Sequence, residues 1–295
     1  MTVLNIIYVN FNSTDLLIKS IQTIFDHNKN RQDLQIIVFD NGSNDDPNRV
    51  KVFFPRINLI LNRKNIGFGA GVNQALSHCH SKYVIFLNPD SLVNNSLIET
   101  SVRFMDQHDK IGILGPMIID EDGSVQGSAR AFPSPLTSIF GRNTPITKLF
   151  PNNKITRSNI LTWRTDNKTP IEVDWVSGAC MVARLEAVQA VGGFDTRFFL
   201  YWEDTDLCKR IRDKGWKVVY YPKIKITHFV GKSSSSRPIF AVFQFHKSCY
   251  KLYAKYTKGP LSILTPLVGI GLMLRFLFAV IFSYSNKALN RVRTI

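Results

Sequence analysis

The most informative candidate for chemistry is a carboxylate at the end of a strand-like segment. Residues Tyr83–Leu87 form a short apolar run, and the sequence then reads Asn88, Pro89, Asp90. Open parallel sheets bind ligands beside the carboxyl ends of their strands, so this run is expected to deliver Asp90 to a cleft. A carboxylate there suits a hard divalent cation held against a diphosphate. The alternative is that Asp90 only caps the helix that follows.

A second acidic cluster follows an aromatic segment late in the chain. Glu203, Asp204 and Asp206 come directly after Phe198–Trp202. Carboxylates at the start of a helix are favourable without any catalysis, because they offset the positive end of the helix dipole. Aromatic side chains suit the stacking of sugar rings. A carboxylate beside them can instead be partly desolvated and take a proton from a hydroxyl group. We favour this catalytic interpretation.

His228 is the candidate for a further metal ligand. It follows a basic strand-like segment, Lys223–Thr227, and precedes a Gly/Ser loop that carries Lys232, Ser233 and Arg237. Such a loop suits a flap over phosphate groups, because cationic donors bind phosphate oxygens strongly. A packed or surface histidine is the alternative.

A polar run is the candidate for recognising a nucleotide base. Asp40 and Asn41 begin the segment Asp40–Asp46, directly after a predicted strand. Asp40 can accept the N3–H of a uracil or thymine ring, or it can only close an Asx turn.

Three glycines at alternate positions, Gly67, Gly69 and Gly71, precede a predicted helix that carries Asn73. A dinucleotide site needs GxGxxG after the first strand, whereas this segment is GxGxG after the third, which argues against nicotinamide or flavin. The sequence has no GxxxxGK[ST], which excludes a P-loop. The glycines let the backbone approach a nucleotide diphosphate at the helix start, or they only make a tight connection.

These residues depend on an alternation of strands and helices in the first third of the chain. The expected strands are Val3–Val9, Gln35–Phe39, Asn58–Leu61 and Tyr83–Leu87, and the expected helices are Thr14–His27 and Gly69–His80. This order predicts an α/β fold with a central, mostly parallel sheet and right-handed crossovers. Polar residues after the strands, such as Asn10 and Asn12, would then gather along one edge.

The later part of the chain carries less regular patterns. Residues 127–172 are rich in Pro, Asn, Thr, Ser and Arg with little periodicity, which predicts a long irregular excursion. The expected elements beyond it are a strand at Asp174–Ala183, helices at Leu185–Val191 and Asp204–Lys214, and a strand at Lys217–Tyr221.

The composition fits a globular protein whose positive charge is concentrated at one end. The 295 residues, 44% of them hydrophobic, suffice for one large domain plus an appendage, or for two small domains. The net charge is +15, but from Lys209 onward 17 Lys and Arg face Asp213 alone. Cys79, Cys180, Cys208 and Cys249 show neither CxxC nor zinc spacing, so we expect reduced packing residues.

The basic end also contains the longest apolar stretch, Leu261–Phe282. Basic groups beside an apolar helix indicate an anionic membrane surface, and no nucleic acid partner is expected. The stretch can cross a bilayer of ~30 Å. However, one span would place Lys287, Arg291 and Arg293 opposite the catalytic domain, against the positive-inside tendency. We therefore expect two short interfacial helices split by Pro266.

The N-terminus opens directly into a predicted strand, without a basic n-region or a cleavage site. Together with the basic apolar tail, this predicts a peripheral protein on the cytoplasmic face of a bacterial inner membrane.

The ordered motifs resemble those of family 2 glycosyltransferases with the GT-A fold, particularly the bacterial rhamnosyltransferase-like branch. The resemblance runs from Val3 to about Ser236 and rests on DNGSND, NIGFGAGVN, FLNPD, SGACMVAR, GGFDTRFFLYWEDTDLCKR and HxxGKS. It implies a GT-A domain over residues 1–238, with a nucleotide-binding half at about 1–115 and an acceptor half at about 116–238. Residues 239–295 would form a helical tail for membrane association.

The resemblance also implies an inverting enzyme that uses a nucleotide-diphosphate sugar and Mg²⁺ or Mn²⁺. It assigns base binding to Asp40, metal binding to Asp90 and His228, and general-base catalysis to Asp204. The usual DxD motif reads Asn88-Pro89-Asp90 here, so one carboxylate faces the metal and diphosphate oxygens would supply several ligands.

The predicted substrate contacts fall into two groups. The donor would be bound by Asn10, Asn12, Asp40, Asn41, Gly67, Gly69, Asn73, Asn88, Asp90, Lys232 and Ser233. The acceptor would be bound by Trp175, Ser177, Gly178, Tyr201, Trp202 and Glu203.

The preferred reaction moves L-rhamnose from dTDP-rhamnose to a glycan or a polyprenyl-diphosphate-linked acceptor in polysaccharide assembly. The alternatives are another donor such as a UDP-hexose, or a non-catalytic membrane scaffold with this fold. A nucleotidyltransferase is disfavoured, because the first strand is followed by Asn10–Ser13 and not by a loop rich in Gly, Arg and Lys.

Overall fold

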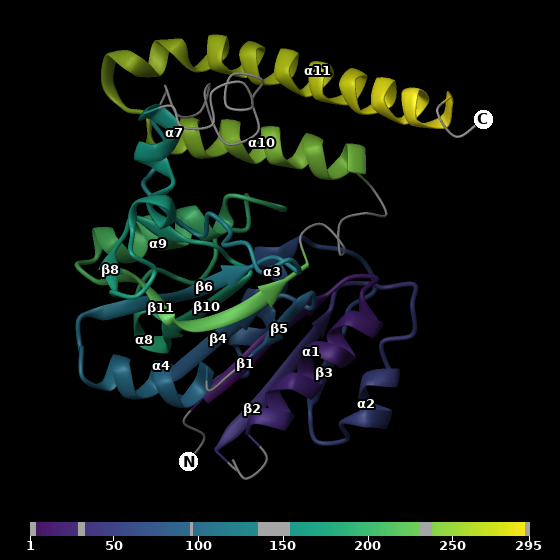
Figure 1. Ribbon diagram of the computed structural model, residues 1–295, viewed down its shortest axis with the longest axis vertical. Helices are drawn as coiled ribbons and strands as arrows, with labels where there is room; N and C mark the ends of the chain where they lie inside the picture. The colour runs from purple at the N-terminus through teal and green to yellow at the C-terminus, as the bar shows by residue number, and fades with distance from the viewer. Residues whose placement is uncertain (1–3, 29–32, 95–96, 135–153, 230–237, 293–295) are drawn as a thin grey trace.

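The computed structural model describes residues 4–28, 33–94, 97–134, 154–229 and 238–292, with the backbone alone at 155–157 and 282–292. A mixed sheet of nine strands forms its centre (Figure 1). The spatial order is β3 (Asn58–Leu61), β2 (Leu34–Asp40), β1 (Leu4–Asn10), β4 (Tyr83–Leu87), β10 (Cys180–Arg184), β6 (Ile111–Ile119), β11 (Lys217–His228) and β5 (Ser91–Val93), and β8 (Ile171–Glu172) also pairs with β11.

The sheet is parallel in its first half and mixed in its second. Strands β3, β2, β1 and β4 run parallel to one another, and β6 runs parallel to β11. Strand β10 is antiparallel to both β4 and β6 and joins the two halves. A separate two-stranded ribbon pairs β7 (Ala129–Arg130) with β9 (Trp175–Val176).

Helices cover both faces of the sheet. One face carries α1 (Thr14–His27), α2 (Arg49–Phe53) and α4 (Leu97–Asp106), and the other carries α3 (Phe68–Leu76), α8 (Leu185–Gln189) and α9 (Glu203–Asp213). Alternate side chains of β1 enter the two cores: Leu4 and Ile6 pack with α1, whereas Ile7 and Val9 pack with α3. Burial on both faces explains why the parallel strands read as continuous apolar runs.

The predicted gathering of polar residues at the carboxyl ends of the strands is confirmed for the first two strands. Asn10 ends β1 directly opposite Asp40, the last residue of β2. The Asn10 side-chain amide donates a hydrogen bond of 2.9 Å to the Asp40 carboxylate. The edge of the sheet that carries these residues also receives Asn88–Asp90 after β4, because β4 is parallel to β1.

Two element boundaries differ from the sequence expectation by more than about two residues. Helix α3 ends at Leu76 and not at His80, because a turn closes where the Cys79 amide donates to the Leu76 carbonyl. Strand β11 continues past Tyr221 to His228, with Ile224 and Ile226 buried and Lys223 and Lys225 exposed. This alternation is that of a half-buried strand, so the expected strand at Lys217–Tyr221 and the strand-like segment Lys223–Thr227 form one element.

The expected strand at Asp174–Ala183 is two strands, β9 and β10, with a break at Ser177–Ala179. In the break the backbone turns its hydrogen-bonding groups to other elements, since the Ser177 amide donates to the Ser128 carbonyl. The ends of the excursion at 127–172 contain β7, α7 (Lys154–Asn159), η1 (Leu161–Arg164) and β8, and residues 135–153 lie outside the described part.

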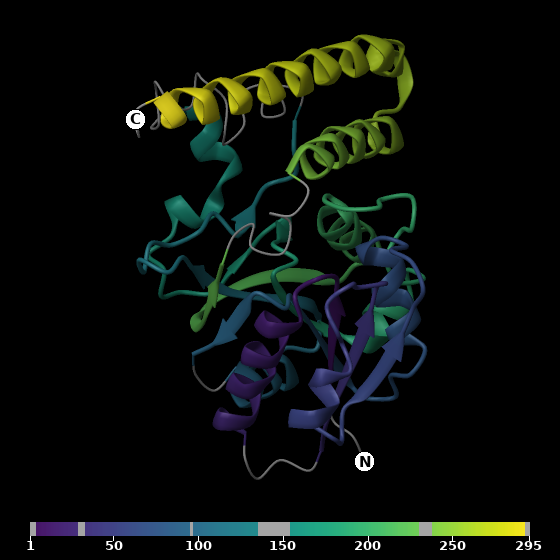
Figure 2. The ribbon, with the colours of Figure 1, turned by 90° about the vertical axis from the view of Figure 1, so that its right-hand side faces the viewer.

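The C-terminal segment forms a helical hairpin on the outside of the α/β body (Figure 2). It comprises α10 (Pro238–Tyr256), the short η2 (Gly259–Leu264) and the long α11 (Thr265–Val292). The expectation of two short helices split by Pro266 is wrong. Pro266 lies in the first turn of one continuous helix, where its missing N–H leaves no bond unmade.

Within the described residues, Gly259–Ile281 is the single helical segment long and apolar enough to cross a membrane, and only 6% of its most apolar stretch is buried. All four cysteines are free and buried, as expected for packing residues. The domain limits at 115 and 238 stay a prediction.

Candidate active site

The structure brings Asp90 and His228 together at the carboxyl ends of β4 and β11. The His228 Nε2 atom lies 3.3 Å from Asp90 Oδ1, and the Asp90 side chain is 3% exposed. The contact joins residues that are far apart in sequence. It arises because Phe229, just beyond β11, donates its amide to the Asp90 carbonyl.

Gln126, which the sequence analysis did not select, orients the His228 ring. Its amide nitrogen donates to Asp120 (2.8 Å) and to the His228 carbonyl (3.0 Å), which leaves its Oε1 atom as an acceptor 3.4 Å from His228 Nδ1. A proton on Nδ1 then leaves the lone pair of Nε2 facing Asp90 Oδ1. Two acceptors that face each other in this way fit a shared cation, so the pair suits a divalent metal.

No group of three or more metal-binding side chains occurs in the ranges that the structure describes. The predicted metal role of Asp90 and His228 stays untested, and the two residues together would supply only part of a set of metal ligands. The remaining coordination positions are available to diphosphate oxygens and water, which are the usual partners of Mg²⁺.

Asp204 lies in the first turn of α9, with both oxygens held by backbone amides. Gly178 N donates to Oδ2 at 2.9 Å, and Thr205 N donates to Oδ1 at 2.7 Å. Burial raises the pKa of the Asp204 carboxyl, and these hydrogen bonds and the charge of Arg130 oppose the rise. A desolvated carboxylate that is fixed in one orientation suits proton abstraction.

The neighbouring Glu203 behaves differently. Burial, followed by the charge of Asp204, raises the pKa of the Glu203 carboxyl to about 8. Its Oε2 atom is buried and has no hydrogen-bond partner among the described residues. At neutral pH Glu203 is therefore largely protonated. Two backbone amides and the charge of Arg130 favour the ionised form of Asp204, which suits Asp204 to the role of a base.

Asp204 and the two residues that flank the Asn88–Ser91 turn around Asp90 bind the same short segment. The amide of Gly178 donates to Asp204, and the carbonyl of the next residue, Ala179, accepts bonds from Asn88 N (3.0 Å) and Ser91 Oγ (3.2 Å), on either side of Asp90. A side chain at Gly178 would meet Asp204 Cβ at 3.3 Å and its Oδ2 atom at 3.4 Å. The break between β9 and β10 therefore supports both the Asp204 carboxylate and the turn that carries Asp90.

The predicted base-binding residues form a bonded cluster. Besides the bond from Asn10, the Asp40 carboxylate accepts hydrogen bonds from the Ser43 amide (3.0 Å) and the Ser43 hydroxyl (2.6 Å). The Asx turn that the sequence offered as the alternative role of Asp40 is therefore present. Asn12 has a left-handed backbone, φ 53°, and its side chain accepts the Asn44 amide. A carboxylate has about four acceptor positions, of which Asn10 and Ser43 fill three on Asp40, and the predicted contact with a base N3–H stays untested.

The glycine segment packs closely against another loop. A side chain at Gly67 would meet the Phe199 carbonyl at 2.6 Å, and one at Gly69 would meet Phe194 at 3.0 Å. Asn41 binds this segment through the Gly67 carbonyl (3.2 Å). Protein packing thus requires these glycines, as expected if they only make a tight connection before α3. Contact between their backbone and the donor stays a prediction.

The Asn73 side chain binds the loop that contains Phe194 and Phe199. Its side-chain nitrogen donates to the Phe194 carbonyl and its oxygen accepts the Phe194 amide, both at 2.8 Å. The side chain therefore holds the 194–199 loop against α3, and its predicted contact with the donor stays untested.

The predicted acceptor side contains a strained aromatic turn. Tyr201 and Trp202, directly before α9, both have left-handed backbones with φ 67° and 70°. Such conformations cost about 1–3 kcal/mol each and persist where the surroundings impose them. The rings of Trp202 and Trp175 lie 6.3 Å apart, and the Trp202 indole N–H is buried without a partner in the described part of the chain.

Two further residues on this side escaped the sequence analysis. Arg130 of β7 lies over the Trp175 ring at 5.1 Å and lowers the pKa of Asp204. Ser128 is 3% exposed, and its hydroxyl has no partner among the described residues, although its carbonyl holds Ser177. Both lie in the excursion whose composition shows no pattern, so only their charge or polarity could have drawn attention to them.

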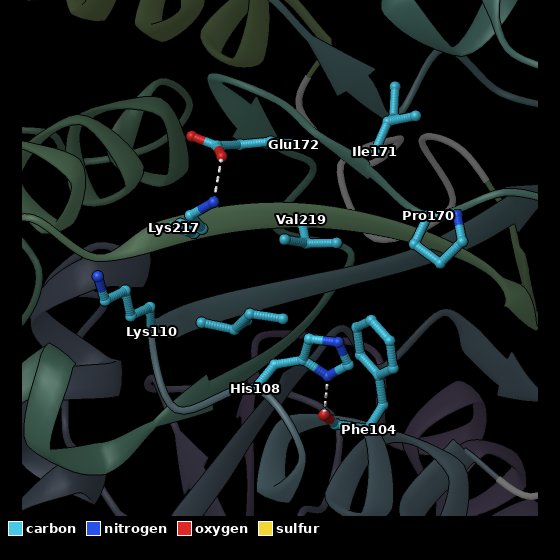
Figure 3. A pocket seen from close by; sticks show the side chains of 9 residues that line it. Phe104, His108, Lys110, Pro170, Ile171, Glu172, Lys217 and Val219 are labelled. Atoms are coloured by element: carbon cyan, nitrogen blue, oxygen red, sulfur yellow. Dashed lines mark hydrogen bonds and ion pairs between the residues drawn. The ribbon is translucent and has the colours of Figure 1, made fainter.

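Lys232 and Ser233 lie outside the described residues, so their predicted phosphate contacts are not tested. A cavity of about 520 Å³, lined among others by Lys110, Glu172 and Lys217, lies at the starting ends of β6 and β11 (Figure 3). It is at the edge opposite His228 and contains none of the predicted site residues.

This arrangement of a mixed sheet, a strand-end aspartate and a late histidine defines a glycosyltransferase of the GT-A fold. The chain belongs to the family described as Glycosyl transferase family 2, which it matches over residues 5–192.

Curated relatives support this assignment. The chain is 31% identical over 240 residues to the N-acetylglucosaminyl-diphospho-decaprenol L-rhamnosyltransferase of Mycobacterium tuberculosis, covering 77% of this chain and 76% of that one. It is 28% identical to rhamnosyltransferase WbbL of Escherichia coli over 64% of this chain and 70% of that one.

A solved structure shows the same fold. The mannosyltransferase PcManGT of Pyrobaculum calidifontis, in complex with GDP-Man and Mn²⁺, superposes with a TM-score of 0.58 at 17% identity, covering 98% of this chain and 75% of that one.

Proposed function

We propose that this glycosyltransferase moves L-rhamnose from dTDP-rhamnose to a polyprenyl-diphosphate-linked sugar. The observation that carries the proposal is that the Gly178–Ala179 segment binds both Asp204 and Ser91, the residue next to Asp90. The rhamnosyltransferase relatives, one of them named for a lipid-diphosphate-linked N-acetylglucosamine acceptor, support the choice of donor and acceptor.

The proposed reaction is a single displacement at the anomeric carbon. The acceptor hydroxyl oxygen attacks this carbon, the bond to the nucleotide diphosphate breaks, and the electron pair leaves with the diphosphate. Asp204 takes the hydroxyl proton on a carboxylate oxygen, because Glu203 is already protonated near neutral pH. The backbone amides of Gly178 and Thr205 hold that carboxylate in place, so no reorganisation is needed during proton transfer.

The departing diphosphate is expected to lie on the Asp90 side. Asp90 and His228 would hold a divalent cation, which when bound neutralises negative charge on the leaving group. Gln126 fixes the tautomer and orientation of His228 for this purpose. Asp40 would bind the N3–H of thymine, which uracil shares, so this contact selects the class of base and not the methyl group.

A donor panel tests the proposal. The purified protein is given dTDP-rhamnose, UDP-glucose, UDP-N-acetylglucosamine or GDP-mannose with a short-chain polyprenyl-diphospho-N-acetylglucosamine, with Mn²⁺ or with EDTA. We expect nucleoside diphosphate release to be fastest with dTDP-rhamnose, to require the acceptor, and to be lost in EDTA. Faster release from a UDP-hexose under the same conditions would reject the proposed donor.

The C-terminal hairpin is proposed to hold the enzyme on an anionic membrane as a peripheral protein. Side chains of η2 and α11 such as Ile263, Leu267 and Leu274 are 62–80% exposed, and residues 239–295 contain no acidic residue. An exposed apolar face with adjacent cations binds the interface of anionic lipids.

Co-sedimentation with vesicles tests the membrane proposal. Leu274→Glu should lower binding to phosphatidylglycerol-containing vesicles by about 10-fold or more, because it places a charge in the apolar face. Glu186→Gln on α8, in the α/β body, serves as the control and should bind as the unaltered protein does. Retention of the unaltered protein in the membrane after high salt and carbonate would contradict peripheral binding.

A further inference from the structure

Helix α10 lies between α9, which carries Asp204, and the outer helix α11 (Figures 1 and 2). Its side chains divide into two faces at helical spacing. Phe245, Ser248 and Lys255 contact the segment 195–206, whereas Phe243 and His246 contact Phe276 of α11, with ring centroids 5.6 and 6.1 Å apart. One face of α10 therefore packs on the α/β body, and the other packs on α11.

The inner face of α10 packs on the strained turn. The Phe245 ring lies 5.9 Å from Tyr201 and 5.4 Å from Trp202, the two consecutive residues with left-handed backbones. Ser248 Oγ donates 2.9 Å to the carbonyl of Leu200, the residue just before them. The turn is thus held at its start and along both rings by a single helix.

Helix α10 also binds the first turn of α9. Asp206, which is fully buried, accepts bonds from Lys255 and from the Tyr256 hydroxyl (2.7 Å), and also from Arg210 within α9 (2.7 Å). Lys255 also binds Asp195 at 2.7 Å. Asp206 therefore serves as an anchor, which separates it from its neighbours in the acidic cluster.

Asp204 lies between these two attachments. The turn at Tyr201–Trp202 precedes it by two residues, and the anchor at Asp206 follows it by two. The inner face of α10 thus contacts the chain on both sides of the proposed base.

We propose that α10 is a positioning element for catalysis, in which Phe245 and Ser248 hold the Leu200–Trp202 turn so that Asp204 faces the acceptor hydroxyl. The proposal rests on the proposed role of Asp204. It assigns a function to a helix beyond the residues 5–192 that match the family. Neither Phe245 nor Ser248 is required to touch a substrate.

Phe245→Leu and Ser248→Ala test the proposal, with Phe243→Leu as the matched control. Phe243 is on the same helix but faces α11, so its substitution disturbs the hairpin and not the turn. We expect Phe245→Leu to lower kcat by roughly 10- to 100-fold, since a displacement of about 1 Å can cost 10²-fold. Ser248→Ala should act in the same direction, and Phe243→Leu should leave kcat nearly unchanged.

Three readouts separate positioning from loss of structure. In Phe245→Leu the Kd for dTDP and the melting temperature should stay close to those of the unaltered protein. The acidic limb of the kcat–pH profile should move to lower pH, because a looser turn admits water and burial no longer raises the pKa of Asp204. A kcat equal to that of the unaltered protein, or parallel losses of kcat, dTDP binding and thermal stability, would overturn the proposal.

Asp204→Asn is measured alongside these variants. If Asp204→Asn is inactive while Phe245→Leu is fully active, the positioning role fails and the proposed base stands. If Asp204→Asn is fully active, the proposed base fails.

Discussion

Asp204→Asn is expected to lower the kcat of sugar transfer by about 10²- to 10⁴-fold, the usual contribution of a positioned general base. The substitution preserves the shape of the side chain, and its oxygen can still accept one of the two bonds from Gly178 and Thr205. It removes the proton-accepting carboxylate. The Kd for the nucleotide donor should therefore stay nearly unchanged, since the proposed contact of Asp204 is with the acceptor hydroxyl.

Single-turnover rates and nucleotide titrations on the same preparation measure the two effects. Asp213→Asn is the matched control, because it makes the same change at the exposed end of the same helix, where Asp213 pairs with Lys209. Near-normal turnover by Asp204→Asn would remove Asp204 from the mechanism.

Asp90→Ala is expected to reduce transfer by about 10²- to 10³-fold, which is the typical effect of losing one preorganised electrostatic contact at a reacting group. Asp90 is the carboxylate of the Asp90–His228 pair, and His228 alone makes a weak site for Mg²⁺ or Mn²⁺. In contrast to Asp204→Asn, this variant should also bind the donor more weakly and need more Mn²⁺ for half-maximal activity.

Titration of activity and of donor binding with Mn²⁺ measures this change. Asp122→Ala, in an exposed turn where Asp122 accepts the Ser124 amide, controls for the loss of one surface carboxylate. An unchanged requirement for Mn²⁺ in Asp90→Ala would show that the metal binds elsewhere.

Much of the fold of the first ninety residues could be predicted from the sequence. Strands Asn58–Leu61 and Tyr83–Leu87 and helix Thr14–His27 have the predicted boundaries. Their patterns are local: a strand buried on both faces is a continuous apolar run, and an amphipathic helix repeats its apolar residues at helical spacing.

The pairings that build the site are not local, which limits what a sequence can reveal. Gln126 and His228 meet because the strand that begins at Lys217 continues through the strand-like segment Lys223–Thr227 to His228. The sequence indicates both parts of this strand, but not that its end lies beside Gln126. Similarly, Arg130 contributes to the Asp204 environment through the ribbon of β7 and β9, whose two-residue strands show no periodicity.

The acidic cluster at 203–206 shows a further limit. Three carboxylates in four positions look alike in sequence, but the structure gives them different environments. Asp206 is an anchor for Lys255 and Tyr256, Glu203 is protonated near neutral pH, and Asp204 is held by backbone amides. Contacts from α10 and from the β9–β10 break, both distant in sequence, make this distinction.

The most direct test of the central claim is a crystal structure of Asp204→Asn with Mn²⁺, dTDP-rhamnose and a short acceptor analogue. We predict density for the metal on Asp90 and His228, and the anomeric carbon of the sugar between that metal and residue 204, with the acceptor hydroxyl on the residue 204 side. A donor sugar bound away from the Gly178–Ala179 segment, or a metal held by other residues, would contradict the account.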